Sequence, residues 1–277
     1  MRLGIFARTF HRSTLDDCLE AIAKLGIRDV HFNLVCTGCE ALPAELTNQQ
    51  CREIRRAFAR HDLDMCGISG TFNAIHPDES LRAELTRRAT LLIEHCHELG
   101  ANLVTLCTGT RDPNDMWTGH AANQQPAAWI DLCETLEKLL AAAGRHQVFL
   151  GIEPEQSNVV NSATRGRRLL DDFSSPHLKI ILDAANLFHA GNLPQMRSVL
   201  DEAFDLLGPD IIMAHAKEFI DESKGPRIPG SGPLDWGYYL MKLSQSGFQG
   251  SLVLHNLDEA SLPDGLSFLK RELAAIL

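Results

Sequence analysis

The sequence has no apolar stretch that approaches the roughly 18 uninterrupted residues of a membrane-spanning helix. Its amino terminus, MRLGIFARTF, lacks the long apolar run and the small-residue cleavage site of a secretory signal. Basic residues are few as well, since 26 Lys and Arg stand against 36 Asp and Glu, a net charge of −10. Binding to duplex nucleic acid draws on clustered cations. We therefore expect a protein that acts neither on a membrane nor on nucleic acid.

A complete cysteine-based zinc site is also missing. Of the eight cysteines only Cys36 and Cys39 have C-x-x-C spacing, and no second pair completes a set of four thiolates. Most of the others fall inside apolar runs, which indicates buried, reduced thiols. Thiols that stay reduced are typical of the cytoplasm, so a cytoplasmic location is expected.

What the chain does contain is an alternation of short, β-branched runs with longer amphipathic segments. The expected strands span residues 2–7, 29–33, 65–69, 103–107, 148–153, 179–183, 211–215 and 252–255. Several of the helical segments end at a glycine suited to the left-handed conformation that stops a helix: Gly26, Gly100, Gly144, Gly208 and Gly247. Eight such units without linker composition predict an α/β fold, a single (β/α)8 TIM barrel over residues 1–277. A doubly wound sheet is disfavoured because no G-x-G-x-x-G follows the first strand.

Polar residues stand at the ends of the last four expected strands: Glu153 and Glu155, Asp183, His215 and Lys217, and His255. In a TIM barrel the carboxyl ends of the strands form the active face, so these side chains are expected to meet. Carboxylates and imidazoles together suit a divalent cation such as Mn, Zn, Co or Fe, and suit Mg less well. The sequence therefore predicts a metal site built from Glu153, Asp183, His215 and His255.

Other strand ends and loops supply candidates for substrate binding. The expected residues are His31, Asn73, His76, Arg111, Trp117, Asn186 and Arg227. For Arg111, a surface salt bridge and recognition of an anion or hydroxyl are equally good interpretations. Arg227 lies in a Gly/Pro-rich loop that could close over a ligand. Asp78 and Asp235 fit helix N-caps better than catalytic roles.

Several motifs in the second half of the chain resemble those of the xylose-isomerase-like TIM-barrel superfamily, in its branch of sugar phosphate isomerases and epimerases. The matching pieces are GIEPE, ILDAANL, AHAKE, GSGPLD and LVLHNL, and the similarity extends over essentially the whole barrel. The resemblance implies a metal-dependent enzyme with a small carbohydrate substrate and, as is common in the family, a homodimer. It does not define the substrate, because the superfamily holds many chemistries on one scaffold.

The resemblance also implies a ligand set. In the epimerases of this superfamily the metal ligands are Glu, Asp, His and Glu on strands five to eight. Glu153, Asp183 and His215 match the first three, whereas His255 stands where those epimerases place a second Glu. Several relatives have a histidine where this chain has Asn186. That departure, with the acidic charge, argues against a zinc cluster of the endonuclease IV kind.

The function expected from this set is a divalent-metal-dependent isomerase or epimerase acting on a sugar or related polyhydroxy carbonyl compound. Glu153 is the expected base, with Glu155 and Lys217 as acid or supporting groups. His255 is expected to bind the metal or, if unbound, to act as an acid or base. Loss of the second Glu leaves a lyase or dehydratase of a keto-sugar as the alternative. A non-catalytic carbohydrate-binding barrel is more remote.

Overall fold

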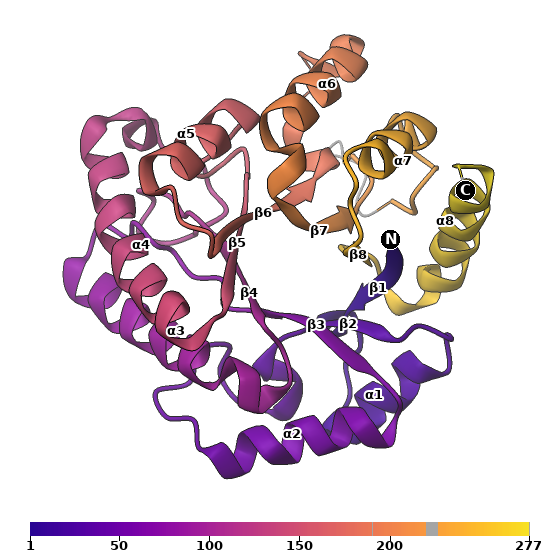
Figure 1. Ribbon diagram of the computed structural model, residues 1–277, viewed down its shortest axis with the longest axis horizontal. Coiled ribbons are helices and arrows are strands. Elements are labelled where there is room, and N and C mark those ends of the chain that lie inside the picture. The colour runs from indigo at the N-terminus through magenta and orange to yellow at the C-terminus, as the bar shows by residue number, and fades with distance from the viewer. Residues whose placement is uncertain (190, 220–226, 277) are drawn as a thin grey trace.

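The computed structural model describes residues 1–189, 191–219 and 227–276. Its strands form a closed barrel in the order β1 to β8, and each strand is parallel to its neighbours (Figure 1). Their bounds are β1 Arg2–Phe6, β2 Asp29–Phe32, β3 Asp64–Ser69, β4 Leu103–Cys107, β5 Phe149–Glu153, β6 Leu178–Asp183, β7 Ile211–Ala216 and β8 Ser251–Leu254. The predicted (β/α)8 barrel is confirmed, and His255 follows β8 directly instead of ending it.

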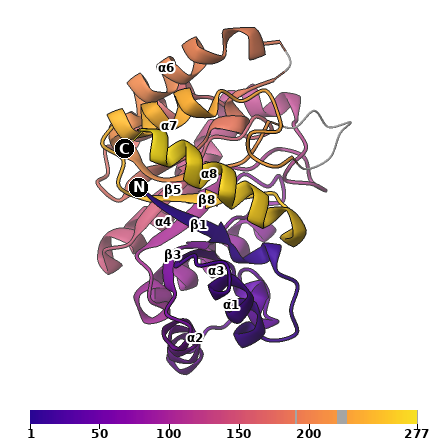
Figure 2. The same ribbon diagram turned by 90° about the vertical axis from the view of Figure 1, so that its right-hand side faces the viewer.

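Helices surround the barrel and separate the strands along the chain (Figures 1 and 2). Their bounds are α1 Leu15–Ala23, α2 Asn48–Arg60, α3 Glu79–Leu99, α4 Pro126–His146, α5 Ala163–Phe173, α6 Met196–Leu207, α7 Trp236–Gln245 and α8 Leu262–Ile276. Short 3-10 turns add η1 Ala7–Thr9, η2 Leu34–Thr37, η3 Ala121–Gln124, η4 Ala184–Leu187, η5 Leu193–Gln195, η6 Gly208–Asp210 and η7 Glu259–Ser261. Within the described part of the chain, no helix is both long and apolar enough to cross a membrane.

Local capping explains where several helices begin. Asp78 accepts hydrogen bonds from the backbone N–H groups of Ser80 and Leu81 at the start of α3, at 2.9 and 3.0 Å. Asp235 accepts one from the Tyr238 N–H at the start of α7, at 3.1 Å. Each carboxylate satisfies backbone donors that have no partner inside the helix. Both residues are therefore the helix caps that the sequence predicted.

Apolar side chains from β4, β6, β7 and β8 fill the interior of the barrel. Leu103, Ile181, Met213 and Val253 form a small buried cluster there. A glycine keeps the space open in β5, since a Cβ atom at Gly151 would collide with the Ile181 side chain. These apolar side chains fill the barrel below the carboxyl ends of the strands, so the polar site above them packs on an apolar layer.

Strand register brings the polar ends to one level. Asp183 pairs with His215 across β6 and β7, and Cys107 pairs with Glu153 across β4 and β5. Because neighbouring parallel strands end at the same edge, the carboxylates and imidazoles after β5 to β8 face one another across the barrel mouth. The fold therefore assembles residues that are far apart in the sequence.

Candidate functional site

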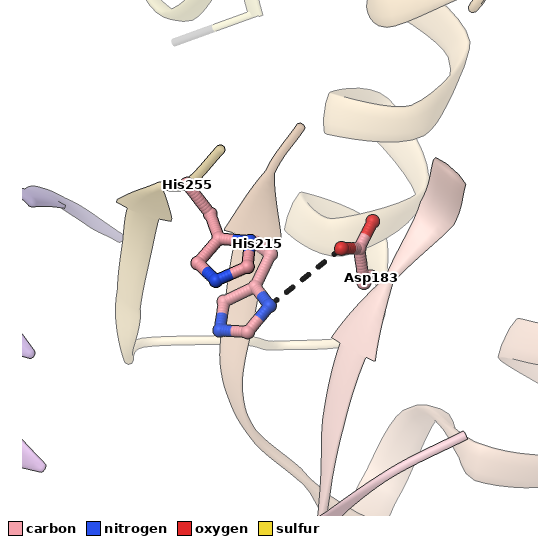
Figure 3. Close-up of side chains that lie close together, drawn as sticks. All are labelled: Asp183, His215 and His255. Atoms are coloured by element: carbon pink, nitrogen blue, oxygen red, sulfur yellow. Dashed lines mark ion pairs between the residues drawn. The ribbon is translucent and has the colours of Figure 1, made fainter. Parts of the chain in front are cut away.

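Three residues at the carboxyl end of the barrel carry side-chain atoms of the kind that bind metal ions, and together they are called the donor group below. Asp183 ends β6, His215 lies in β7, and His255 comes directly after β8. One ligand atom from each lies within 4.8 Å of the others (Figure 3). Among the described residues this is the one group of His, Cys, Asp and Glu that meets such a spacing. Three of the four predicted ligands therefore converge.

The fourth predicted ligand, Glu153, lies against this group. Its Oε1 is 3.2 Å from His215 Nδ1, and Asp183 Oδ2 is 3.7 Å from the same nitrogen. Asn186, on η4, donates its Nδ2–H to Glu153 Oε1 at 2.8 Å. Glu153 is thus fixed at the edge of the donor group by a histidine and an amide, and its role as a ligand stays a prediction.

The histidines share one aromatic cluster. The rings of His215 and His255 stack with centroids 4.8 Å apart and planes 9° from parallel. His31, at the end of β2, stacks on Phe6 at 4.6 Å and lies 6.0 Å from the His215 ring. His31 Nε2 is 2.9 Å from the Thr105 hydroxyl, a partner that sequence reasoning missed. Phe6, at the end of β1, lines the site beside His255.

Lys217 brings a positive charge to the same place. Its Nζ donates to Asn186 Oδ1 at 2.6 Å and lies 3.6 Å from Asp183 Oδ2. Burial acts to lower the pKa of Lys217, but the carboxylates of Asp183, Glu153 and Glu155 outweigh it and raise the pKa above its ordinary value. Lys217 is therefore charged, and it orients the amide that in turn holds Glu153.

The donor group and the neighbouring His31 contain buried polar atoms that have no hydrogen-bond partner among the described residues. They are His31 Nδ1, Asp183 Oδ2, His215 Nε2 and His255 Nδ1. A buried polar atom left unpaired costs about 1–3 kcal/mol, so native structures rarely cluster them without a reason. Two imidazoles and a carboxylate are the donor types that first-row divalent cations prefer. The residues present fit a bound metal ion.

The protonation states are set by burial and by the neighbouring charges. Burial acts to raise the pKa of Asp183, but Lys217 and His215 outweigh it and hold the pKa at about 2. Burial acts to lower the pKa of His215, but Glu153 and Asp183 raise it to about 9. Burial, followed by the charges of His215 and Lys217, lowers the pKa of His255 to about 3. His255 is thus a neutral imidazole with a lone pair to donate, and a proton on His215 holds the two carboxylates together.

Glu155 differs from the other acids of the site. Burial, together with the negative charges of Glu153 and Asp183, raises the pKa of Glu155 to about 7, although Lys217 opposes the change. Its backbone N–H donates to the Val160 carbonyl at 3.0 Å, which anchors the residue just beyond β5. A carboxyl group with a pKa near neutrality can both release and accept a proton under physiological conditions.

Three of the residues expected to bind substrate are engaged in loop contacts. Asn73 donates to the Thr110 carbonyl at 2.8 Å and accepts from the Thr110 N–H at 3.0 Å, so it ties two loops together. His76 Nε2 lies 3.1 Å from the Pro113 carbonyl. Arg111 pairs with Asp131 of α4 at 2.6 Å, with both side chains largely buried. Arg111 therefore forms a salt bridge, as one of its two interpretations predicted. Roles in substrate binding for Asn73, His76 and Arg111 stay predictions.

Trp117 and Arg227, which were also expected to bind substrate, have no hydrogen bond or ion pair with the donor group in the described part of the chain. Trp117, in the loop after β4, is 52% exposed, a large fraction for an indole ring. Arg227 is half-buried in the segment that leads into α7. Of the seven residues expected to bind substrate, His31 and Asn186 are the two that lie in the cluster around Asp183 and His215.

Glu218 is a structural residue that sequence reasoning did not single out. It is 1% exposed, and its carboxylate accepts from Gly230 N–H at 3.0 Å, Leu234 N–H at 3.1 Å and Trp236 Nε1–H at 2.8 Å. Gly232 passes so close that a Cβ atom there would lie 2.5 Å from Glu218. The available signal was an acid two residues after a strand, followed by the Gly/Pro-rich stretch PGSGPLDW.

Solved structures with the same fold include several sugar epimerases. The 3-keto-D-glucoside 4-epimerase of E. coli superposes with a TM-score of 0.75 at 19% identity, covering 98% of this chain and 99% of that one. An L-ribulose 3-epimerase gives 0.78 at 16% identity, with 99% and 95% covered. A xylose isomerase-like TIM barrel protein from Mycobacterium smegmatis in complex with magnesium gives 0.70 at 15% identity, with 95% and 89% covered. Such low identities establish the shared fold.

Comparison by sequence gives the family. No curated protein matches the chain significantly. The family model of the xylose isomerase-like TIM barrel matches residues 19–272, which is most of the chain and includes every residue of the donor group. The chain therefore belongs to the xylose isomerase-like TIM barrel family.

Proposed function

We propose that this protein is a divalent-metal-dependent isomerase or epimerase that acts on a sugar or a related polyhydroxy carbonyl compound. The observation that carries the proposal is the group formed by Asp183, His215 and His255, whose ligand atoms lie within 4.8 Å of one another. Unsatisfied buried atoms on all three residues add to it. The sugar epimerases among the structural neighbours support the substrate class.

The metal would be held by Asp183, His215 and His255, with Glu153 as the fourth ligand. A cation bound there would polarise the substrate carbonyl and its adjacent hydroxyl, so that the neighbouring C–H becomes acidic. Nitrogen donors favour Mn, Zn, Co or Fe over Mg, although the neighbour from M. smegmatis is a magnesium complex.

The remaining chemistry belongs to the side chains around that group. Glu153 is the base in the proposal, because Asn186 and His215 fix its carboxylate at hydrogen-bonding distances. Glu155, whose pKa lies at about 7, can return a proton to the substrate. Lys217 keeps Asn186 in place and supplies a positive charge for oxygen atoms that become negative in the reaction.

A lyase acting on a keto-sugar is the second candidate. The specific observation in its favour is His255, which offers an imidazole with a pKa of about 3 instead of a second carboxylate. Such a group is a poor proton donor at neutral pH. Epimerisation needs proton transfer on both faces of the substrate, whereas elimination needs one carboxylate base and a leaving group. The residues of this site therefore suit elimination as well.

Incubation of the protein with ketoses in D2O separates the two reactions. We expect an isomer that has gained one deuterium at the carbon beside the carbonyl, detected by mass spectrometry and NMR. A product that has lost the mass of water would identify a lyase. A Glu153→Gln variant provides the control, since it should still take up metal through Asp183, His215 and His255 but should not exchange the proton. Exchange at the wild-type rate in that variant would contradict the role of Glu153.

A further inference from the structure

A pocket adjoins the donor group on the side of β1 and β8. It has a volume of about 460 Å3 and is lined by Phe6, Arg8, Thr9 and His11 together with residues 255–259. Phe6 and His255 belong to both places, and their rings lie 5.2 Å apart. A ligand whose reacting atoms lie at the metal ligands can therefore extend directly into this pocket.

The acidic residues of the pocket are engaged in local contacts. Glu259 is held by Arg12 through two hydrogen bonds of 2.5 and 2.9 Å, the bidentate geometry of a strong ion pair. Asp258 accepts from the Ser261 N–H at 2.8 Å and caps η7. The charge of Glu259 is thus offset by Arg12, and the carboxylate of Asp258 is held at the start of η7.

Arg8, which also lines the pocket, differs from Glu259 because it has no ion-pair partner among the described residues. It lies on η1, directly after β1, with its side chain exposed, and it pairs with no acid among the residues that the structure describes. A guanidinium presents a planar fork of donors that matches a phosphate or a carboxylate. Arg8 is therefore a positive charge that has no acidic partner among the described residues, in a protein whose net charge is −10.

We infer that this pocket binds an anionic substituent of the substrate, a phosphate or a carboxylate, with Arg8 as its principal donor. The inference rests on the proposed function, because it places the carbonyl end of the same molecule at Asp183, His215 and His255. The substrate class becomes a sugar phosphate or a sugar acid. Arg8 selects it by charge in a protein whose overall field repels anions.

The test compares matched neutral and anionic sugars. Binding of D-fructose, D-fructose 6-phosphate and D-fructuronate is measured by calorimetry on protein freed of metal with EDTA, so that no anion can bind through a metal ion. The variants are Arg8→Gln and, as a control for charge alone, Arg145→Gln. Arg145 lies in the last turn of α4, where its contact with Glu94 is 4.0 Å long.

We expect wild-type protein and the Arg145→Gln variant to bind at least one of the two anionic sugars more tightly than fructose. The Arg8→Gln variant should lose roughly tenfold to a hundredfold of that affinity, the usual range for one charge-assisted contact, and should bind fructose unchanged. Comparison of the affinities for D-fructose 6-phosphate and D-fructuronate shows which anion the pocket prefers. Equal binding of neutral and anionic sugars, failure to bind either anion, or a preference that survives Arg8→Gln would overturn the inference.

Titration of the same proteins with Co2+ keeps this inference separate from the proposed function. Arg8→Gln should take up Co2+ as the wild type does, since Arg8 is no ligand. Protein that binds anionic sugars through Arg8 but takes up no metal would refute the proposed function alone. Protein that takes up metal but has no anion preference would refute the Arg8 pocket alone.

Discussion

The imidazole rings of His215 and His255 stack face to face, with centroids 4.8 Å apart and planes 9° from parallel. Two protonated rings at that separation would repel each other in a buried site. Burial, followed by the charge of His215, lowers the pKa of His255, whereas the carboxylates of Glu153 and Asp183 outweigh burial and raise the pKa of His215. His215 is therefore protonated in the metal-free protein, whereas His255 keeps a free lone pair.

Removal of one carboxylate oxygen from the donor group should weaken metal binding. The Asp183→Asn variant replaces an oxygen that has no hydrogen-bond partner with an amide of nearly the same shape. We expect its affinity for Mn2+ or Co2+, measured by calorimetry, to fall by at least roughly tenfold, which is the scale seen even for residues that support ligands indirectly. Asp201→Asn, a substitution on α6 at a carboxylate paired with Lys242, is the control and should bind normally. Unchanged affinity in Asp183→Asn would contradict the assignment.

His255 can be tested by substituting the carboxylate that the resemblance to the epimerases implies at this position. In His255→Glu a third acidic group joins Asp183 and Glu153, so the metal-free variant should be less stable than the wild type. Bound Mn2+ should remove that repulsion, and the rise in Tm on adding Mn2+ should be larger than in the wild type. His255→Ala is the matched control, in which the rise should shrink. A full rise in His255→Ala would mean that the imidazole does not bind the metal.

Stability of the metal-free protein should depend on the protonation of His215. The folded pKa of about 9 lies above the ordinary value of about 6.5 for an unfolded chain. The stabilising contribution of the proton is therefore fully present below about pH 6.5 and is lost as the pH rises through about 9. We expect the Tm in EDTA to fall across this range and the Tm in saturating Mn2+ to fall less. His215→Asn should flatten the EDTA curve; an equally steep curve in that variant would point to other groups.

Glu218 should matter for stability without touching the donor group. Glu218→Ala leaves the N–H groups of Gly230, Leu234 and Trp236 without their buried acceptor. We expect the free energy of unfolding, measured in urea, to fall by on the order of 3 kcal/mol, because each buried donor left unpaired costs about 1–3 kcal/mol. Glu20→Ala, which removes an exposed i,i+4 pair with Lys24, should cost less than about 1 kcal/mol. Similar losses in the two variants would argue against the anchoring role.

The barrel could be predicted from the sequence because its signals are local. Short β-branched runs, amphipathic helical segments and capping residues such as Asp235 each act within a few positions, and parallel strands must end at one edge. The same edge rule predicts from the sequence alone that Asp183 and His215 lie close together, and the register of β6 and β7 confirms it.

Other features depend on contacts that local patterns do not record. Arg111 pairs with Asp131, which lies on α4 twenty positions away in the sequence, and this contact occupies the side chain expected to meet substrate. One predicted helix end was wrong, since α4 passes Gly144 and ends at His146, where Gln147 with φ 53° is the cap. The end of α6 at Gly208 is confirmed, but Gly208 has φ −45° instead of a left-handed conformation and begins η6. Glycine permits a left-handed turn, but packing against the barrel decides where the turn occurs.

The most direct test of the central claim is diffraction from crystals grown with Mn2+, with anomalous data collected on both sides of the manganese absorption edge. We predict one anomalous peak among Asp183, His215 and His255, within bonding distance of all three and of Glu153. The absence of a peak at these residues, or a peak that His255 does not contact, would contradict the proposed metal site.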